Sequence, residues 1–510
     1  MSTMNRLLGV GAALLFAAVA DCDSTSNTQQ PMDMAGAPDL SMTTGDPDLG
    51  TEPDLAAGPD LAVTPPTLTS ATPALVPSTG ATMVAFTGTN IESGATLKVG
   101  GTAATNLQLT PPTSLLADVP AKPAACGPVA VELTNPSGGK VTTSTILSYF
   151  LTTTAYKMLG LNTPSLVDAP EAVAIGDITG DKLPDLVFTT TGAASAGSIT
   201  MLSSNGAGNY NVAKQFATGK RSPRGVALAD INNDGKLDVL VPHFGDPTVV
   251  VRASDGTGAL TQLPDFTVTG TAAPTLRALQ VADMDGDKNL DLIIGDAAND
   301  RVVIALGDGK GNFVQKGAYA TGFSTSAAFV IAVGLFDGDK FPDVAISGGS
   351  GSAAALLLND GTGALKAVTA LGTAGANPRG ITAGDFNKDG KLDLAVASLT
   401  DSTITLYTGN GLGVLTKQAT LVKTGSGPRE ITTADINCDG NLDLISANSK
   451  MDNVSVLVGD GKLGFVEKQF ATGAAPGVIA AADLNNDGRI DIAVANDTPK
   501  TATVLLNDGQ

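Results

Sequence analysis

From about residue 150 onward, short apolar segments alternate with acidic loops at a regular spacing. The stretch "DINNDGKLDVLV", residues 230 to 241, shows one unit, in which a loop with three carboxylates runs directly into an apolar strand. Such loops begin at residues 177, 230, 283, 335, 385, 435 and 483, which are 48 to 53 residues apart. A period of this length with several short strands is typical of repeats that close into a ring. We therefore expect seven sheets of four strands each.

The last repeat lacks a strand at its C-terminal end. It stops at "NDGQ", residues 507 to 510, where the other units continue into a fourth strand. An open edge would leave backbone groups without partners. The stretch "TTAYKMLGLNTP", residues 153 to 164, precedes the first unit, and we expect it to pair with the strand ending near Leu506. The alternative is that it serves only as a linker.

Residues 64 to 150 show a different pattern, in which apolar and polar positions alternate between Gly and Pro turns. Alternation with a period of two predicts strands with one buried face. Pro73, "TGTN" at 87 to 90, "VGG" at 99 to 101 and "NPSGG" at 135 to 139 closely resemble the landmarks of IPT/TIG domains. The resemblance implies an immunoglobulin-like β-sandwich, which in such domains serves as a spacer or an interaction module.

The N-terminus has the pattern of a targeting segment. Arg6 precedes the apolar run from residue 7 to 19, whose 13 residues suit a signal peptide and are too few to span a bilayer. "VADC", residues 19 to 22, resembles a bacterial lipobox in which Cys22 is lipidated, although Asp21 departs from the small residue expected there. We interpret residues 1 to 22 as a signal peptide of the lipoprotein type, with ordinary secretion as the alternative.

The segment from residue 23 to 63 repeats Pro-Asp-Leu four times without apolar periodicity. Frequent proline and acidic repulsion favour an extended, disordered spacer. We therefore divide the chain into a signal peptide, this linker, a sandwich at 64 to 150 and a repeat array at 151 to 510.

Composition and charge narrow the possible partners. Sixty Gly, 28 Pro and no Trp favour short strands and tight turns over long helices. The net charge of −20 opposes binding to nucleic acid and to anionic lipid, because like charges repel. We expect the chain to contact a membrane only through a lipid anchor, to be monomeric, and to attract cations.

The acidic loops follow the pattern D-x-[DN]-x-D-G-x-x-D or a close variant, with side-chain oxygens at positions 1, 3, 5 and 9. Ca²⁺ prefers several oxygen ligands at once, which explains why carboxylates are crowded together. Five loops provide all four side chains: Asp230, Asn232, Asp234 and Asp238; Asp283, Asp285, Asp287 and Asp291; Asp385, Asn387, Asp389 and Asp393; Asp435, Asn437, Asp439 and Asp443; Asp483, Asn485, Asp487 and Asp491.

Two loops depart from this pattern. The first keeps three carboxylates, Asp177, Asp181 and Asp185, but has Thr179 at position 3, so we expect weaker binding. The fourth has Leu335 at position 1 and retains Asp337, Asp339 and Asp343, so its site is expected to be largely lost. The sequence therefore predicts about five to six Ca²⁺ ions per chain.

The turns that close the repeats add a more specific resemblance. "SDGTGAL" at 254 to 260, "GDGKGNF" at 307 to 313 and "NDGTGAL" at 359 to 365, together with the acidic loops, resemble FG-GAP/VCBS repeats. These repeats build seven-bladed β-propellers similar to the integrin α-subunit head. The expected fold class is all-β, an immunoglobulin-like sandwich followed by a seven-bladed β-propeller.

Four arginines recur six residues before the first position of a loop: Arg224, Arg277, Arg379 and Arg429. Because they share one structural position, we expect them near the channel mouth, on the face opposite the loops. They could form a cationic rim that accepts a carboxylate or another anion. The alternative is that each arginine pairs with an acid or carbonyl of a neighbouring blade.

Few residues support catalysis. His243 is the only histidine, and we expect it to lie exposed in a loop. A site with several histidines is impossible, and no disulfide is expected among Cys22, Cys126 and Cys438.

We interpret the protein as a non-catalytic, calcium-stabilised extracytoplasmic binding or adhesion module at the bacterial cell envelope, with a protein or glycan ligand. The alternatives are an enzyme acting on envelope polysaccharide or lipid and a passive scaffold.

Overall fold

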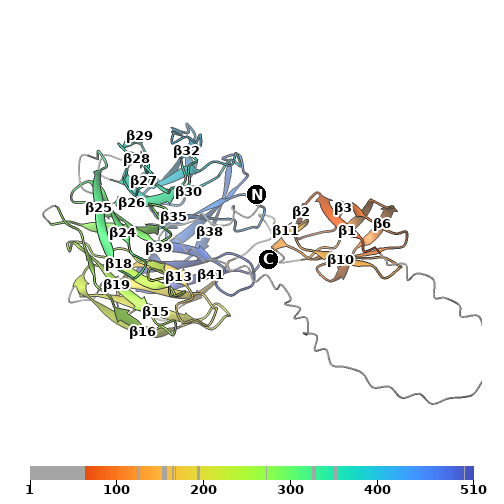
Figure 1. Cartoon of the computed structure of the whole chain (residues 1–510), viewed down its shortest axis with the longest axis horizontal. Helices are drawn as coiled ribbons and strands as arrows, with labels where there is room; N and C mark the ends of the chain where they lie inside the picture. The colour runs from red at the N-terminus through yellow and green to blue at the C-terminus, as the bar shows by residue number, and fades with distance from the viewer. Residues whose placement is uncertain are drawn as a thin grey trace, which may run out of the picture.

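The computed structural model describes residues 64–122, 126–151, 158–162, 166, 168–191, 196–270, 273–323, 329–348, 353–498 and 500–509. The expected signal peptide, Cys22 and the linker lie outside these residues. Every element within them is a β-strand, and no helix there could span a membrane. Figure 1 shows a small sandwich in red and orange beside a larger ring of sheets.

The N-terminal domain is a sandwich of short strands. One sheet has the order β1 (Thr67–Thr72), β3 (Thr82–Thr89), β7 (Ser114–Val119), β6 (Thr105–Thr110). The second has the order β10 (Lys140–Thr143), β9 (Val131–Thr134), β4 (Thr96–Val99), β5 (Thr102–Ala103). A third small sheet has the order β2 (Leu75–Pro77), β11 (Ser148–Phe150), β8 (Gly127–Pro128).

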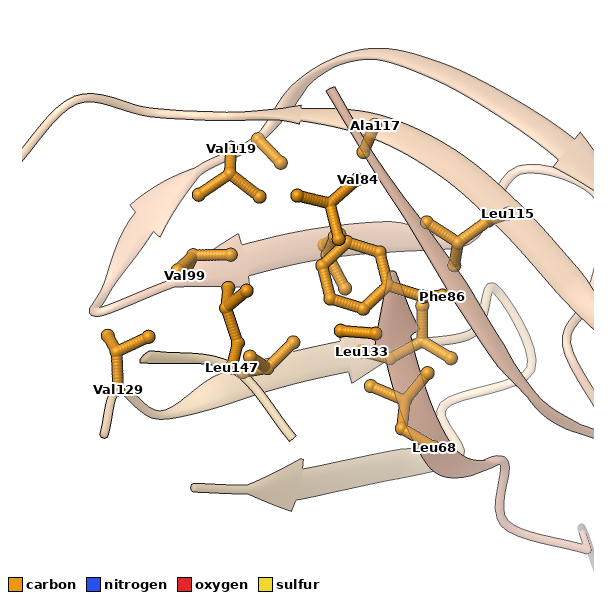
Figure 2. Packing of buried hydrophobic residues seen from close by; sticks show 14 of the residues in the cluster. Leu68, Val84, Phe86, Val99, Leu115, Ala117, Val119, Val129, Leu133 and Leu147 are labelled. Atoms are coloured by element: carbon orange, nitrogen blue, oxygen red, sulfur yellow. The ribbon is translucent and has the colours of Figure 1, made fainter. Parts of the chain in front are cut away.

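The core of the sandwich forms because both sheets turn their apolar positions inward. Strand β7 alternates partly and fully buried residues along its whole length, as a half-buried strand should. Figure 2 shows the ring of Phe86 from β3 among Val84, Leu115 and Leu133, the last from the opposite sheet. The immunoglobulin-like packing expected from the sequence is therefore present.

After Leu151 the described residues form seven sheets, which we number by their acidic loops. Sheets one to three contain β13 (Ala169–Gly176), β14 (Asp185–Thr191), β15 (Ala196–Ser204) and β16 (Tyr210–Arg221); β17 (Ala227–Ala229), β18 (Asp238–Pro242), β19 (Thr248–Ser254), β20 (Leu260–Gln262) and β21 (Phe266–Thr267); β22 (Leu276–Ala282), β23 (Asp291–Asp296), β24 (Arg301–Gly307) and β25 (Phe313–Ala320).

Sheets four and five contain β26 (Phe329–Gly334), β27 (Asp343–Gly348), β28 (Ala353–Leu357) and β29 (Thr369–Thr373); β30 (Pro378–Gly384), β31 (Asp393–Ser398), β32 (Thr403–Gly409), β33 (Leu415–Lys417) and β34 (Val422–Lys423). Sheets six and seven contain β35 (Pro428–Ala434), β36 (Asp443–Asn448), β37 (Asn453–Gly459) and β38 (Phe465–Ala471); β39 (Ala474–Ala482), β40 (Asp491–Thr498), β41 (Thr501–Asn507) and β12 (Met158–Asn162). Sheets two and five have five strands because their outer strand is split into two pieces.

The first strands of the seven sheets form a closed circle. Each contacts the first strand of the next sheet, and β39 of the seventh sheet returns to β13 of the first. The second strands of sheets two to six are buried along their whole length, and those of sheets one and seven up to their last one or two residues, since each faces a neighbouring sheet on both sides. The all-β sandwich followed by a β-propeller is therefore confirmed.

The ring closes through strands from opposite ends of the array. Strand β12 pairs antiparallel with β41, with Met158 opposite Asn507 and Asn162 opposite Thr503. The predicted pairing is confirmed for residues 158–162, while 153–157 and 163–164 lie outside the described residues. An N-terminal strand thus covers the edge that the last repeat leaves open.

A disulfide joins the two domains, which corrects the expectation that none forms. Cys126 of the sandwich is bonded to Cys438 in the sixth acidic loop, at a sequence separation of 312 residues. Close by, the Leu151 N–H donates to the Asn437 carbonyl at 2.6 Å, and Leu151 packs with Ile436 in the propeller core. The pairing was missed because only the docking of the domains brings the two thiols together.

Peptide mapping tests this disulfide. Digestion of the full chain without reductant should yield one species that contains the peptides around Cys126 and Cys438, and reduction should separate them. Cys126→Ser should leave the Cys438 thiol reactive toward an alkylating reagent. Both thiols reactive in the unreduced wild-type chain would contradict the bond.

Two truncations test ring closure. A chain that starts at residue 151 retains β12, whereas one that starts at residue 166 loses it, and both lack Cys126. We expect the first to melt cooperatively and the second to melt at a markedly lower temperature or aggregate, because the β41 edge loses its partner. Equal melting temperatures would show that β12 is dispensable.

Candidate metal centres and an arginine-lined cavity

The seven acidic loops occupy equivalent places, between the first and second strands of each sheet. The Asp at position 9 is in every case the first residue of the second strand: Asp185, Asp238, Asp291, Asp343, Asp393, Asp443 and Asp491. All seven loops therefore lie at one end of the propeller.

The position 9 carboxylate fastens each loop to its sheet. In the second loop, Asp238 is fully buried, and its Oδ2 accepts from the Ile231 N–H at 3.2 Å. Its Oδ1 accepts from the Ser254 N–H at 2.9 Å, at the end of the third strand. The same two bonds recur in all seven sheets at 2.7 to 3.2 Å. This residue is thus a structural anchor, whatever its part in holding a metal.

Burial controls the electrostatics of these carboxylates. It raises the pKa of Asp238 to about 6 and that of Asp291 to about 7, and nearby loop carboxylates add to the rise. The two backbone N–H donors oppose the rise, because they stabilise the ionised form. The buried carboxylates thus lie in an environment that a cation would make more favourable.

The oxygens at positions 1, 3 and 5 converge within the loops. In the second loop, the Asp234 N–H donates both to Asp230 Oδ1 at 3.1 Å and to Asn232 Oδ1 at 2.9 Å. In the third, carboxylate oxygens of Asp283, Asp285 and Asp287 lie within 4.8 Å of one another. A group of close, partly exposed oxygens fits the ligand preference of Ca²⁺.

A pair of left-handed backbone positions bends each complete loop. In the second loop, Asn233 and Gly235 at positions 4 and 6 have φ of 59° and 80°. In the third loop the residue types are exchanged, with Gly286 at position 4 and Lys288 at position 6, at 81° and 74°. The bend is kept because at least one of the two positions is Gly, which adopts positive φ without a steric penalty.

The first and fourth loops differ from the other five in the way that their sequences suggest. In the first, the Thr179 hydroxyl donates to Asp185 Oδ2 at 3.0 Å, so the position 3 side chain is engaged with the anchor. In the fourth, Leu335 brings no oxygen to position 1, and the Asp339 N–H bonds only to Asp337 Oδ1, at 3.1 Å. The first loop therefore offers a hydroxyl in place of an amide or carboxylate oxygen at position 3, and the fourth loop lacks the position 1 carboxylate.

The four arginines predicted to share a position do meet. Arg224, Arg277, Arg379 and Arg429 line one cavity of about 130 Å³ among the first strands of the ring. Each lies near the start of a first strand, at the end opposite the acidic loops. The cationic rim expected from the sequence is therefore a cavity wall contributed by sheets two, three, five and six.

Two of these arginines are paired and two are not. Arg224 forms an ion pair with Glu171 of the first sheet, and Arg429 forms one with Asp497 at 2.5 Å in the seventh. Arg379 donates from Nε to Asn377 Oδ1 at 3.1 Å, and Arg277 lies over the ring of Phe244. Among the described residues, two of the four arginines thus form an ion pair with a neighbouring sheet.

Two acidic residues of the cavity were not predicted. Glu171 lies six residues before Asp177, so it is the first sheet's counterpart of the arginines, and the same offset could have revealed it. Glu430 follows Arg429 and also lines the cavity, where burial raises its pKa to about 7. No sequence pattern marks Glu430, because nothing in its neighbours shows that it faces the channel.

His243 is not exposed, contrary to expectation. It is fully buried, with Nε2 3.0 Å from the Thr218 hydroxyl and Nδ1 3.4 Å from the Thr248 carbonyl. Burial lowers its pKa to about 4, so the ring is neutral near pH 7. The loop folds back between the second and third strands, where His243 supports the packing of the second sheet.

Sequence families agree with this architecture. A family model for the FG-GAP-like repeat matches residues 177–241, 283–346, 336–396, 389–446 and 439–494, more than half of the chain. The chain belongs to the FG-GAP-like repeat family. A model for the IPT/TIG domain matches residues 66–149. Both families are typical of extracellular proteins, and together they fit an extracellular binding or adhesion module.

The solved structures that match this chain are distant in sequence. A Lactobacillus plantarum protein is 16% identical, with a TM-score of 0.48 over 69% of this chain and 97% of its own. The Pseudomonas aeruginosa periplasmic gluconolactonase PpgL is 15% identical, with a TM-score of 0.44 over 69% and 94%. An Agrocybe aegerita protein that recognises non-reducing terminal N-acetylglucosamine is 17% identical, with a TM-score of 0.42 over 81% and 97%. No curated protein matches the sequence.

Two substitutions in one loop separate anchoring from metal binding. Asp238→Ala removes the acceptor of two buried N–H groups and should lower the free energy of unfolding by roughly 2 to 5 kcal/mol. Asp234→Ala, the matched control, removes an exposed carboxylate and should change it by less than about 1 kcal/mol. Urea unfolding in the presence of a chelator measures the free energy of unfolding of both variants without a contribution from bound metal. Equal effects would contradict the anchoring role.

Proposed function

We propose that the FG-GAP protein is a calcium-stabilised binding or adhesion module that works outside the cytoplasm, at the bacterial cell envelope. The observation that supports it most directly is the repeated convergence of side-chain oxygens in the loops, shown by the shared Asp234 N–H and the three close carboxylates of the third loop. Five loops carry the full set of oxygens, and the first carries a weaker one. The proposed role is binding to a protein or glycan and not catalysis.

Calcium would supply charge neutralisation and local rigidity. In the second loop, Asp230, Asn232 and Asp234 would hold the ion, with Asp238 behind them, and the corresponding residues would do so elsewhere. Extracellular calcium modules bind with Kd of about 10⁻⁴ to 10⁻³ M. At about 1 mM calcium and a Kd of about 0.1 mM, each site would add roughly 1.4 kcal/mol to stability.

The loops also connect neighbouring sheets, so their rigidity matters for the whole ring. The Gly311 N–H of the third sheet donates to the Ile231 carbonyl of the second loop at 3.0 Å. The Asn507 side chain of the seventh sheet donates to the Ile436 carbonyl of the sixth loop at 2.9 Å. A stiffened loop would therefore hold two sheets in place, which suits a module that has to present a fixed surface.

Native mass spectrometry tests this proposal. In calcium-containing buffer the full chain should carry five or six ions, and removal of calcium should lower the melting temperature. Asp234→Ala should lose one ion, whereas Asp339→Ala in the deficient fourth loop, as the matched control, should lose none. A chain that carries two ions or fewer would overturn the proposal.

A further inference from the structure

The arginine cavity holds positive charge that the protein does not neutralise. Of its four arginines, Arg224 and Arg429 are paired with Glu171 and Asp497, respectively. Among the described residues no carboxylate forms an ion pair with Arg277 or Arg379. The cavity wall holds these two guanidinium groups together with Arg224, Arg429, Glu171 and Glu430, so it carries more arginines than carboxylates in a chain of net charge −20.

The close approach of the arginines is electrostatically unfavourable, and this points to an anionic ligand in the cavity. Burial and the like charges of Arg379, Arg224 and Arg429 lower the pKa of Arg277 to about 10. Placing partly buried like charges together is unfavourable unless an opposite charge or hydrogen-bond acceptor compensates. The Arg277 guanidinium carbon lies 5.8 Å from the centroid of the Phe244 ring, a contact that positions the group without neutralising its charge.

Two buried polar atoms in the cavity wall lack a hydrogen-bond partner, and they indicate which further group the ligand carries. The Gln280 Oε1 atom and the Arg224 Nε atom are buried without a hydrogen-bond partner, and both residues line the cavity. The first accepts a hydrogen bond and the second donates one. A ligand that has only a carboxylate would leave Gln280 unsatisfied, whereas a neighbouring hydroxyl group could donate to it.

The remaining groups of the cavity limit the size of the ligand. The volume of about 130 Å³ is below the roughly 300 to 1,000 Å³ of pockets for drug-sized ligands, so one small unit fits. Apolar residues such as Val226, Ile331 and Ile381 form the rest of the wall. The cavity also faces Glu171, paired with Arg224, and Glu430, whose Oε2 accepts from the Ile479 N–H at 2.9 Å.

We propose that this cavity binds a carboxylate that carries a neighbouring hydroxyl group, with Arg277 and Arg379 donating to the carboxylate and Gln280 accepting from the hydroxyl. Uronic acid units of acidic glycans and free hydroxy acids share this chemistry. The inference rests on the proposed binding function and names the ligand class and the surface that serves it. With no Trp and 5 Tyr, the chain has little aromatic surface for sugar stacking, so charge carries the recognition.

Isothermal titration calorimetry of the full chain in saturating calcium tests the inference. Glucuronate and gluconate should bind, whereas glucose, which lacks the carboxylate, and acetate, which lacks the hydroxyl, should bind at least tenfold more weakly. Tighter binding of a glucuronate oligosaccharide than of gluconate would assign the site to a glycan, and the reverse would assign it to a free hydroxy acid. Equal binding of sulfate and glucuronate would overturn the proposed ligand class.

Variants assign the binding to the named side chains. Arg277→Ala and Arg379→Ala should each weaken glucuronate binding roughly tenfold or more, since each removes a charge-assisted contact. Arg221→Ala, on the exposed end of β16, removes the same charge elsewhere and should leave the affinity unchanged. Glu171→Gln should tighten binding, because it frees Arg224, and this gain cannot arise from a loss of stability. If an alanine variant does not fold, Arg277→Lys and Arg379→Lys replace it, and weaker binding is again expected.

Parallel ion counting separates this inference from the proposed function. A sample that carries five or six calcium ions but does not bind glucuronate or gluconate overturns only the carboxylate site. Affinities of Arg277→Ala and Arg379→Ala within twofold of wild type would overturn it as well. Loss of calcium binding with intact glucuronate binding would instead contradict the calcium proposal.

Discussion

The propeller depends on a buried aspartate repeated once in every sheet. Each position 9 carboxylate, such as Asp238, accepts one N–H from its own loop and one from the end of the third strand. It thereby joins the acidic loop of a sheet to its third strand, at a buried point where water cannot replace a lost partner. The exposed oxygens at positions 1, 3 and 5 can face a cation because the anchor behind them fixes the loop. The fourth loop keeps its anchor, Asp343, although Leu335 at position 1 brings no carboxylate, so anchoring does not depend on the full set of loop oxygens.

Charge is divided between the two ends of the ring. The loops concentrate carboxylates at one end, where the proposed calcium ions would compensate them. The cavity at the other end gathers four arginines, of which Arg224 and Arg429 form ion pairs within the protein. Both ends are repeats of one sequence position, displayed in a circle by the strands between them. The propeller thus gathers side chains from several sheets around one cavity, which no single sheet could provide.

The sandwich is fixed to the end of the ring that carries the acidic loops and not to the arginine end. Its Cys126 is bonded to Cys438, which holds the left-handed fourth position of the sixth loop, with φ of 56°. The neighbouring Asn437 belongs to the same loop and accepts the Leu151 N–H. The cavity-lining arginines therefore lie at the end of the ring away from this junction.

The sequence by itself determined the features that are local or periodic. The spacing of the loops predicted the sheets, the truncated last repeat predicted the β12 to β41 pairing, and a shared offset placed the four arginines together. Only the tertiary structure decided the features that depend on what a side chain faces. His243 is buried because the loop that carries it folds back onto the second sheet. The docking of the two domains paired Cys126 with Cys438, which are 312 residues apart in the sequence. Neighbouring sheets supply carboxylates that pair with Arg224 and Arg429, whereas within the described part of the chain Arg277 and Arg379 form no ion pair. Periodicity records the position of a residue within its own repeat, but pairing and burial depend on residues contributed by other repeats and by the other domain.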